Sequence, residues 1–282
     1  MLEAQLMAMA RAVVYVLEAF VLLWIAKAAY TRVYRRVCLK AELFDKGNTA
    51  VAVAACGYLL GIIIALGGVL TGPSGGWQAD LTGIAQYGLL TVAMMLVASF
   101  LCEKVLLSRF DNTKEVVEDQ NLGTAFVEAG VHIANGLIVL AVLQGEGVWW
   151  VGLVFWGLAQ VVLMLAGRLY QLATPHDIHA ELERDNAAVG LAFGGVLVGM
   201  GNIVSIAVAG DFIGWQSGLT TFAVDVVFGF VVLFLIKKLT DVLLAPGVRL
   251  GEQQTQATPQ IGAGLLEALG YVGGSMLIVW VF

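Results

Sequence analysis

Eight long apolar stretches determine what this chain can fold into. Each is close to the length of about 20 residues that a helix needs to cross the hydrocarbon core of a bilayer. Only 13% of the 282 residues are charged, where a soluble domain has about a quarter. The sequence therefore predicts an all-α membrane protein with eight transmembrane helices, at 9–30, 49–70, 81–102, 122–143, 148–167, 187–208, 216–236 and 261–282.

The first apolar stretch has two interpretations. A small-residue site at 26–28 is typical of a secretory signal peptide, but such a peptide begins with basic residues. Here the first charged residue is Glu3, and Glu18 interrupts the apolar run. We expect a first helix that is retained.

Composition excludes several classes of function. The formal net charge is −6, so the electrostatic attraction that nucleic-acid binding needs is missing. The cysteines Cys38, Cys56 and Cys102 are odd in number and show neither a disulfide framework nor a zinc spacing. No catalytic or cofactor motif is present. We expect no enzyme activity, no cofactor and no nucleic-acid partner.

Basic residues predict how the chain is oriented. Of the 15 lysines and arginines, 13 lie in four connecting segments, 31–48, 103–121, 168–186 and 237–260. By the positive-inside rule these segments are cytoplasmic and both termini are extracytoplasmic. An aromatic belt at the opposite ends supports this orientation, and it consists of Trp77, Trp149, Trp150, Trp215 and Trp280.

The chain contains an internal repeat with an offset of 138 residues. The segment from Lys46, KGNTAVAVAACGYLLG, aligns with RDNAAVGLAFGGVLVG from Arg184, and GWQADLTGIA from Gly76 aligns with GWQSGLTTFA from Gly214. The repeat predicts two units, 1–145 and 146–282, with four spans each. An even number of spans gives both units one orientation, related by a pseudo-twofold axis along the membrane normal.

A weaker repeat lies within each unit. Each inward-to-outward span opens with an amide residue, at Asn48, Asn121, Asn186 and Gln260. The basic building block is then a hairpin of two helices used four times. We expect the three asparagines to be helix N-caps. The alternative is that the helix N-termini converge and bind an anion.

This pattern of Asn, small residues and spaced glycines resembles the YjfL-like bacterial inner-membrane proteins, an uncharacterised family known as domain of unknown function 350. The chain is similar to two such units in tandem, with Gln260 departing from the expected Asn. The resemblance implies a bacterial inner-membrane location and a role in envelope maintenance or envelope stress.

Glycines recur four residues apart in two of the spans, as the pairs Gly57, Gly61 and Gly195, Gly199. Such GxxxG patterns bring helix backbones into close contact. A pore lined by exposed backbone is the alternative.

Carboxylates within the spans are the candidate ion or proton sites, because each is costly to place in a bilayer. They are Glu18, Glu128, Asp225 and Glu267. His132 and Asn135 follow Glu128 at i+4 and i+7 on one helical face. The alternative is a structural role in hydrogen bonds between helices. Asp225 and Glu18 have no acidic counterparts in the other repeat.

The third basic segment predicts a short interfacial helix with Thr174 as N-cap and Pro175 as its first residue. His176, His179 and Glu183 on it could bind a metal, but the spacing is not that of a zincin and the first repeat has no histidine there, so we expect a solvated helix.

Two functions remain open. One is a membrane structural or envelope-stress component that acts through cytoplasmic protein partners. The other is a channel or transporter for cations or protons. In either case we expect contacts with the lipid bilayer, and a homo-oligomer is compatible with both.

Overall fold

The fold is known from a computed structural model that describes residues 2–34, 37–72, 74–145, 148–210 and 212–282. Eight of its helices are long and apolar enough to span a membrane, which confirms the predicted number of spans. Arg35 and Arg36, two of the basic residues used to predict orientation, lie outside the described residues. The long helices are α1 (Leu2–Val33), α2 (Thr49–Leu70), α3 (Trp77–Leu101), α5 (Leu122–Gln144), α6 (Trp149–Ala173), α8 (Ala187–Val208), α9 (Trp215–Leu239) and α11 (Ile261–Val281).

Short elements gather at one end of the bundle. They are the helices α4 (Asn112–Val117), α7 (Ile178–Leu182) and α10 (Leu250–Gln254), and the π-helical turns Ala41–Asp45, Cys102–Leu106 and Thr240–Leu244. This end contains the basic connecting segments, and we call it the basic end. The opposite end, where Trp77, Trp149 and Trp215 begin α3, α6 and α9, is the tryptophan end.

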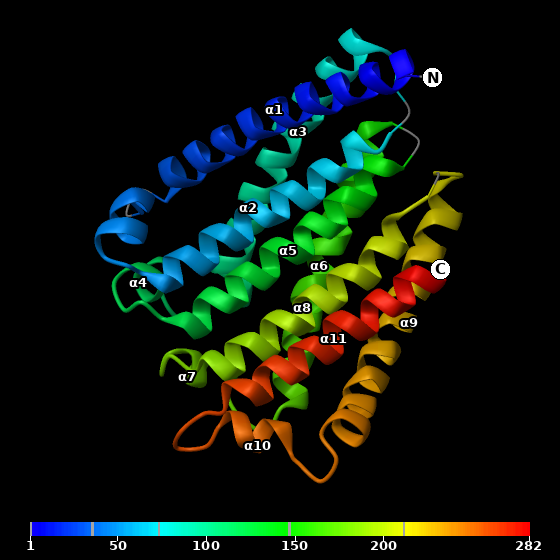
Figure 1. Cartoon of the computed structure of the whole chain (residues 1–282). Coiled ribbons are helices and arrows are strands. Elements are labelled where there is room, and N and C mark those ends of the chain that lie inside the picture. Colours follow the sequence, from blue (N-terminus) through cyan, green and yellow to red (C-terminus); the bar gives the residue numbers. More distant parts are fainter. Residues whose placement is uncertain (1, 35–36, 73, 146–147, 211) are drawn as a thin grey trace.

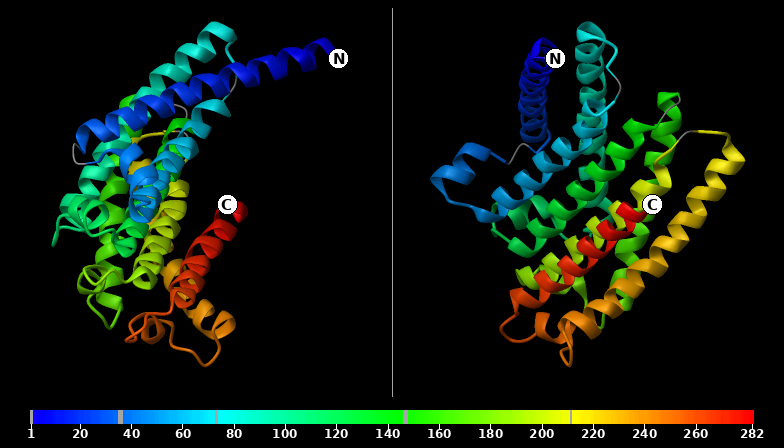
Figure 2. Two further views of the ribbon diagram at one scale, coloured as in Figure 1. Left: turned by 60° about the vertical axis from the view of Figure 1, so that its left-hand side comes forward. Right: turned by 45° about the vertical axis from the view of Figure 1, so that its right-hand side comes forward.

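Four helices form a single row. In Figure 1, α2, α5, α8 and α11 lie side by side in that order, and each packs closely against the next. The helices α3, α6 and α9 form a second layer, in which α3 packs on α2 and α5, α6 on α8, and α9 on α8 and α11. Figure 2 shows α1 at one edge of the molecule, where it contacts α2 and α3.

The row confirms the internal repeat. Each hairpin runs down a second-layer helix or α1, passes through a short element at the basic end and returns along a helix of the row. The two π-helical turns Cys102–Leu106 and Thr240–Leu244 start 138 residues apart, the offset of the sequence repeat. The two repeats stand in line, and the row is open, because α2 and α11 lie at its opposite ends.

Glycine makes the close packing of the row possible. A Cβ atom added to Gly57 would lie 2.5 Å from the Cα of Ala129, and one added to Gly195 would lie 2.5 Å from the Cα of Ala268. These contacts join α2 to α5 and α8 to α11 at equivalent positions. Gly61 faces the backbone of His132 in the same way, so a side chain there would force the helices apart.

Gly199 fits less tightly, because an added Cβ would lie 3.1 Å from the Tyr271 carbonyl oxygen. All four glycines nevertheless lie at helix contacts rather than in an open lining.

Large apolar side chains cover the outside of the long helices. On α1 they include Leu17, Phe20 and Trp24, and on α9 they include Val224 and Val227, all of them more than half exposed. A water-facing surface of this kind would be unfavourable, whereas lipid solvates it. The arrangement is that of a multi-pass membrane protein.

Candidate functional site

A network of amide side chains holds the basic end together. Asn48 begins α2, and its Oδ1 accepts a hydrogen bond from the backbone N–H of Val51 at 3.0 Å. Its Nδ2 donates to a Glu42 carboxylate oxygen at 3.3 Å and to the carbonyls of Val116 and Val117 at 3.2 and 3.1 Å. One buried side chain therefore caps its own helix and also satisfies two carbonyls at the end of α4, in the next hairpin.

The same contacts recur in the next two hairpins. Asn121 and Asn186 cap α5 and α8 through their Oδ1 atoms. The Nδ2 of Asn121 donates to the carboxylate of Glu115, in the preceding short helix, and to the carbonyl of Leu182, which ends the following one. The Nδ2 of Asn186 donates in the same way to the carboxylate of Glu181 and to the carbonyl of Gln254. The caps thus link each hairpin laterally to its successor.

The fourth hairpin ends this chain of caps. Gln260 begins α11 without a side-chain cap, and its Nε2 donates to the nearby Thr258 carbonyl. Gln254, six residues earlier, stands where the first two hairpins have Glu42 and Glu115. Its side chain turns inward and donates to Glu267 at 2.8 Å.

Burial shifts the pKa of one carboxylate in this network. Desolvation raises the pKa of Glu115, while the hydrogen bond from Asn121 acts in the opposite direction.

Glu267 is a buried and fully partnered carboxylate. Only 2% of the residue is exposed, although α11 is at the end of the row. Tyr170 of α6 donates its hydroxyl to Oε1 at 3.0 Å, and Lys237 of α9 lies 3.3 Å from Oε2. Lys237 also pairs with Asp241 at 2.6 Å. Glu267 is therefore one member of a small ionic cluster between α6, α9 and α11.

Glu128, the equivalent residue of the first repeat, has different surroundings. It lines a small pocket with Tyr30, Tyr34 and Thr113 that offers about 20 Å³ of free volume, enough for one water molecule. Tyr30 corresponds to Tyr170, since each lies three residues before the end of its helix. Among the described residues, no hydrogen bond or ion pair reaches Glu128. At the position of Lys237, 138 residues earlier, the first repeat has Ser99.

His132 and Asn135 lie on the same helix as Glu128 but contact different neighbours. The Nδ1 of His132 lies 3.4 Å from the Ser99 hydroxyl of α3, and its ring packs edge-on against Tyr58 of α2. Asn135 accepts a hydrogen bond from Gln160 of α6 at 2.7 Å. The side chains predicted to share one face of this helix therefore make separate polar contacts, each with different neighbouring helices.

Glu18 and Asp225 are distant from these residues. Glu18 lies on α1, and its Oε2 is buried without a hydrogen-bond partner. Asp225 lies on α9 and is half-buried. The two helices stand toward opposite ends of the molecule (Figure 1), so the candidate carboxylates occupy separate places.

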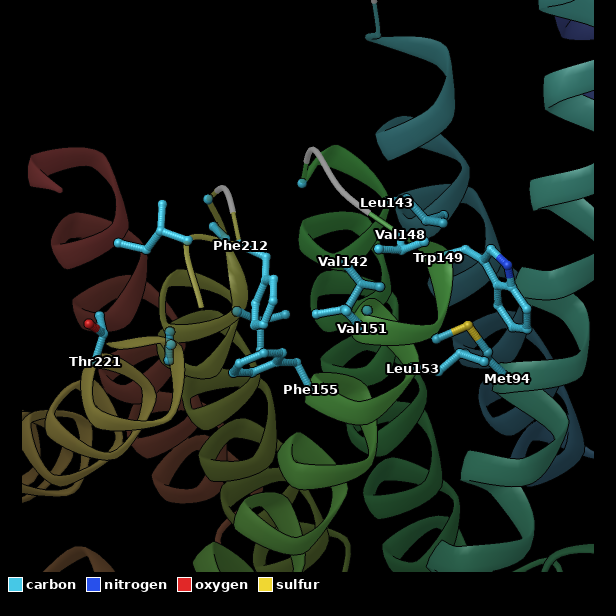
Figure 3. A pocket seen from close by; sticks show the side chains of 18 of the residues that line it. Met94, Val142, Leu143, Val148, Trp149, Val151, Leu153, Phe155, Phe212 and Thr221 are labelled. Atoms are coloured by element: carbon cyan, nitrogen blue, oxygen red, sulfur yellow. The ribbon is translucent and has the colours of Figure 1, made fainter. Parts of the chain in front are cut away.

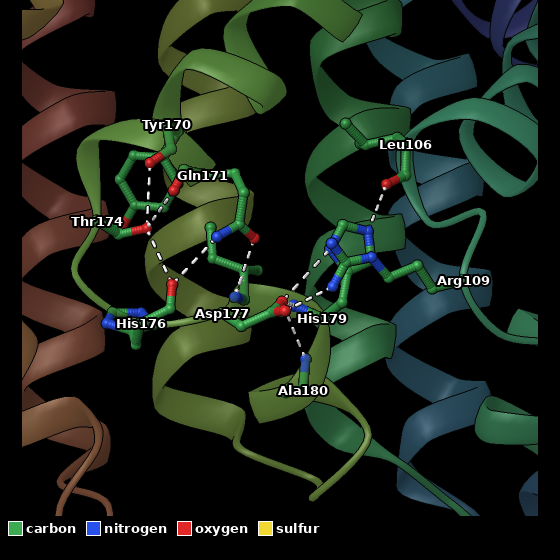
Figure 4. Close-up of polar contacts among 10 residues, drawn as sticks. Leu106, Arg109, Tyr170, Gln171, Thr174, His176, Asp177, His179 and Ala180 are labelled. Carbon is green, nitrogen blue, oxygen red and sulfur yellow. Dashed lines mark hydrogen bonds and ion pairs between the residues drawn. The ribbon is translucent and has the colours of Figure 1, made fainter.

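The short helix α7 does not begin where we expected. Asp177, rather than Thr174, is the N-cap, accepting from the N–H of His179 at 3.0 Å (Figure 4). Thr174 instead ends α6 as its C-cap, and its hydroxyl donates to the Tyr170 carbonyl at 3.1 Å. Arg109 donates to Asp177, which lowers the pKa of that carboxyl.

The two histidines of the third segment do not form a metal site with their neighbours. His179 contacts the Leu106 carbonyl through Nε2 at 3.0 Å, and both ring nitrogens of His176 are buried without partners. Burial lowers the pKa of His176. Within the described part of the chain, no three His, Cys, Asp or Glu side chains gather closely enough to hold a metal ion.

A pocket at the tryptophan end was not foreseen from the sequence. It has a volume of about 340 Å³ and lies among α3, α5, α6, α8 and α9 (Figure 3). Its walls are mainly apolar and include Met94, Val142, Trp149, Phe155 and Phe212. Residues from five helices form it, so no local sequence pattern could reveal it; the tryptophans and glycines of the turns are the only signal.

Comparison with known proteins agrees with this architecture. The model of the family described as Domain of Unknown Function (DUF350) matches the chain twice, over residues 1–143 and 146–282. The chain is also 18% identical over 185 residues to a UPF0719 transmembrane protein of Aquifex aeolicus (strain VF5). That alignment covers 64% of this chain and 66% of the relative, just under two thirds of its length. No solved structure matches.

The two family matches together span almost all of the chain and fall on the two halves of the row. They confirm the tandem duplication. The chain therefore belongs to the DUF350 family, an uncharacterised family of membrane proteins, and contains two tandem copies of its domain.

Proposed function

We propose that this protein is a structural component of the bacterial inner membrane, a scaffold whose cytoplasmic face holds protein partners in fixed positions. The observation that carries the proposal is the lateral chain of caps made by Asn48, Asn121 and Asn186. By the positive-inside rule, the basic end is the cytoplasmic one.

The caps act on α2, α5 and α8, and the glycine contacts act on these three helices and on α11. At the basic end, each asparagine joins three or four backbone and side-chain groups from two hairpins. Further along, Gly57 and Gly195 bring neighbouring backbones into contact, and packed backbones resist sliding. Because the row is held both by the caps at the basic end and by the glycine contacts further along, its helices have little freedom to separate and open a transport pathway. It keeps α4, α7 and α10 in register along the cytoplasmic face, where a partner can dock.

The distribution of the intramembrane carboxylates also favours a scaffold. Glu267 is paired with Lys237, and Glu18 and Asp225 lie on α1 and α9, away from the centre of the row. A transport pathway needs groups that follow one another at short distances, whereas these are spread over four helices.

Glu128 favours a second candidate function, the exchange of a proton or monovalent cation. It is a carboxylate within a span, next to a pocket large enough for one water molecule and without a paired cation among the described residues. Intramembrane carboxylates of this kind mark ion and proton pathways in other proteins. In this second function, Glu128 binds the proton or cation, and His132, on the same helix, modifies the affinity of that site.

Complementation and flux together separate the two functions. A strain lacking the gene receives the wild type, Glu128→Gln or Asn121→Ala, and its growth under envelope stress is measured. The same proteins are placed in liposomes for proton and cation flux assays. For a scaffold, Glu128→Gln restores growth, Asn121→Ala does so less well, and liposomes show no flux above protein-free controls.

Flux in the wild type that is lost in a folded Glu128→Gln, Glu267→Gln double variant would refute the scaffold and support transport. Glu267→Gln alone indicates which carboxylate is responsible.

Reporter fusions test the proposed orientation. Fusions truncated after Arg36 and after Trp77 should report opposite sides of the membrane, with the first cytoplasmic. Two reporters on one side would contradict the orientation.

A further inference from the structure

A groove with charged walls lies at the tryptophan end, between α1, α2 and α3. Its volume is about 610 Å³. Small residues such as Ala12, Gly72 and Gly83 leave the space open, and Arg11 and Asp80 provide its charges. It is separate from the amide network of the basic end.

Arg11 is an unusual residue for this place. It is one of only two basic residues outside the four basic segments, the other being Lys27. Its Nη1 lies 3.4 Å from the Ser74 hydroxyl, a long contact, and its Nε is buried without a hydrogen-bond partner. A guanidinium has five N–H donors, so most of its capacity to bind an anion is unused.

Asp80, by contrast, is held firmly in place. It accepts hydrogen bonds from the Tyr15 hydroxyl, the Ser74 hydroxyl and the Gly75 N–H, the last at 2.8 Å. Ser74 lies between the two charges, since it contacts both Arg11 and Asp80. A fixed anion and a cation with free donors therefore share one groove. Their charges are complementary to a zwitterion rather than to a simple anion.

The groove continues into apolar space. Tyr87 and Leu143 line both this groove and the apolar pocket of about 340 Å³ seen in Figure 3. The two cavities thus adjoin across α3 and α5, with charged groups at one side and apolar walls at the other. A ligand that fills both must have a charged head and a hydrocarbon tail.

The level of the groove in the membrane fits the same ligand. Trp77 begins α3 three residues before Asp80, and Trp149 lines the adjoining pocket. Tryptophan favours the interface between headgroups and hydrocarbon. Arg11 and Asp80 are then at the depth of the lipid headgroups, and the apolar pocket is beside the part of the acyl chains nearest to the headgroups.

We propose that this groove binds one zwitterionic glycerophospholipid with a primary ammonium headgroup. Its phosphate binds Arg11, its ammonium faces Asp80, and one acyl chain passes Tyr87 and Leu143 into the apolar pocket. The site is independent of the proposed function, because it lies at the other end of the molecule.

Native mass spectrometry of the purified full chain in mild detergent tests the proposal. The probes are phosphatidylethanolamine, phosphatidylglycerol and free phosphoethanolamine, which has the headgroup without the chains. The variants are Arg11→Gln, Asp80→Asn and Gly83→Leu. Gly83 lines the groove, and a Cβ there meets nothing within 4 Å, so a leucine side chain would begin in open space and extend into the groove.

Lys27→Gln is the control for Arg11→Gln, because Lys27 is exposed on the same helix, α1. Gly157→Leu on α6 is the control for Gly83→Leu, because a Cβ at Gly157 also meets nothing within 4 Å. The wild type and both controls should bind one phosphatidylethanolamine in preference to phosphatidylglycerol. Arg11→Gln and Gly83→Leu should weaken binding about tenfold or more, which corresponds to losing a charge-assisted contact. Asp80→Asn should reverse the preference toward phosphatidylglycerol.

Three results would overturn the proposal. The first is equal lipid binding by the wild type, Arg11→Gln and Gly83→Leu. The second is a preference for phosphatidylglycerol in the wild type. The third is binding of free phosphoethanolamine as tight as that of the lipid, which would show that the apolar pocket has no part in recognition.

Discussion

Lys237 lies 3.3 Å from Glu267, and this contact distinguishes the two repeats. Lys237 is near the end of α9 and is a quarter exposed in its side chain, while the side chain of Glu267 is almost fully buried. In the first repeat Glu128 occupies the equivalent position, but Ser99 replaces the lysine. Both repeats therefore have the carboxylate, but its electrostatic surroundings differ between them.

Removing Lys237 should destabilise the protein strongly. In Lys237→Met, Glu267 stays buried without its counter-charge, and breaking one side of a buried ion pair costs about 3 kcal/mol. Unfolding in detergent, followed by tryptophan fluorescence, measures the loss. The double variant Lys237→Met, Glu267→Gln should recover most of it. Glu128→Gln is the control and should leave the midpoint unchanged; an equal loss in that variant would contradict the distinction between the repeats.

A cap can be added to the fourth hairpin. Gln260 has the extended backbone of an N-cap, with φ −89° and ψ 101°, but no side-chain cap bond. Gln260→Asn should stabilise α11 by about 1 kcal/mol, the usual value of an N-cap. Hydrogen exchange in the first turn of α11 should slow.

The opposite change at Asn121 provides the comparison. Asn121→Ala removes the cap of α5 and leaves a buried carbonyl of Leu182 without its donor, so we expect a loss of about 2 kcal/mol. A loss well below that of a single cap would mean that the lateral bonds contribute nothing.

The glycine contacts should tolerate no side chain. Gly61→Leu would place atoms against the His132 backbone and force α2 away from α5. We expect loss of the monodisperse folded protein in size-exclusion chromatography. Gly273→Leu on α11, where an added Cβ meets nothing within 4 Å, is the control and should behave as the wild type. Normal thermal stability of Gly61→Leu would show that the row can adjust.

His176 should make the protein less stable in acid. Burial lowers its pKa below the ordinary value of 6.5, although the carboxylates of Glu181, Glu267 and Asp177 act in the opposite direction. A depressed pKa in the folded state contributes stability above pH 6.5, and this is lost as the pH falls through the folded value. The midpoint of thermal unfolding should therefore drop between pH 7.5 and pH 5. His176→Gln should drop less; an identical drop would assign the effect to other groups.

The architecture was predictable because its signals are local or periodic. Apolar length reveals each span, and the residues that open the spans at Asn48, Asn121, Asn186 and Gln260 reveal the hairpins. Even the departure at Gln260 could be seen, and it is where the chain of caps ends.

The contacts of the candidate sites could not be predicted, because they depend on tertiary structure. Nothing in the sequence indicates that Lys237, at the edge of a basic segment, reaches back to Glu267. Helical spacing placed Glu128, His132 and Asn135 on one face, but that face meets α2, α3 and α6 at once, so each side chain has its own neighbours. Arg11 stands out in the sequence as a basic residue outside the basic segments, but its position beside Ser74 and in the same groove as Asp80 depends on tertiary structure.

The open row determines the order in which the helices should unfold. Since each hairpin contacts mainly its neighbours, the fold resembles a one-dimensional stack, in which stability is a sum of unit and nearest-neighbour terms. In the final unit, α11 begins without a side-chain cap. Unfolding should accordingly begin by fraying at α11 and proceed inward, leaving α5 and α8 as the last helices to lose protection from solvent exchange.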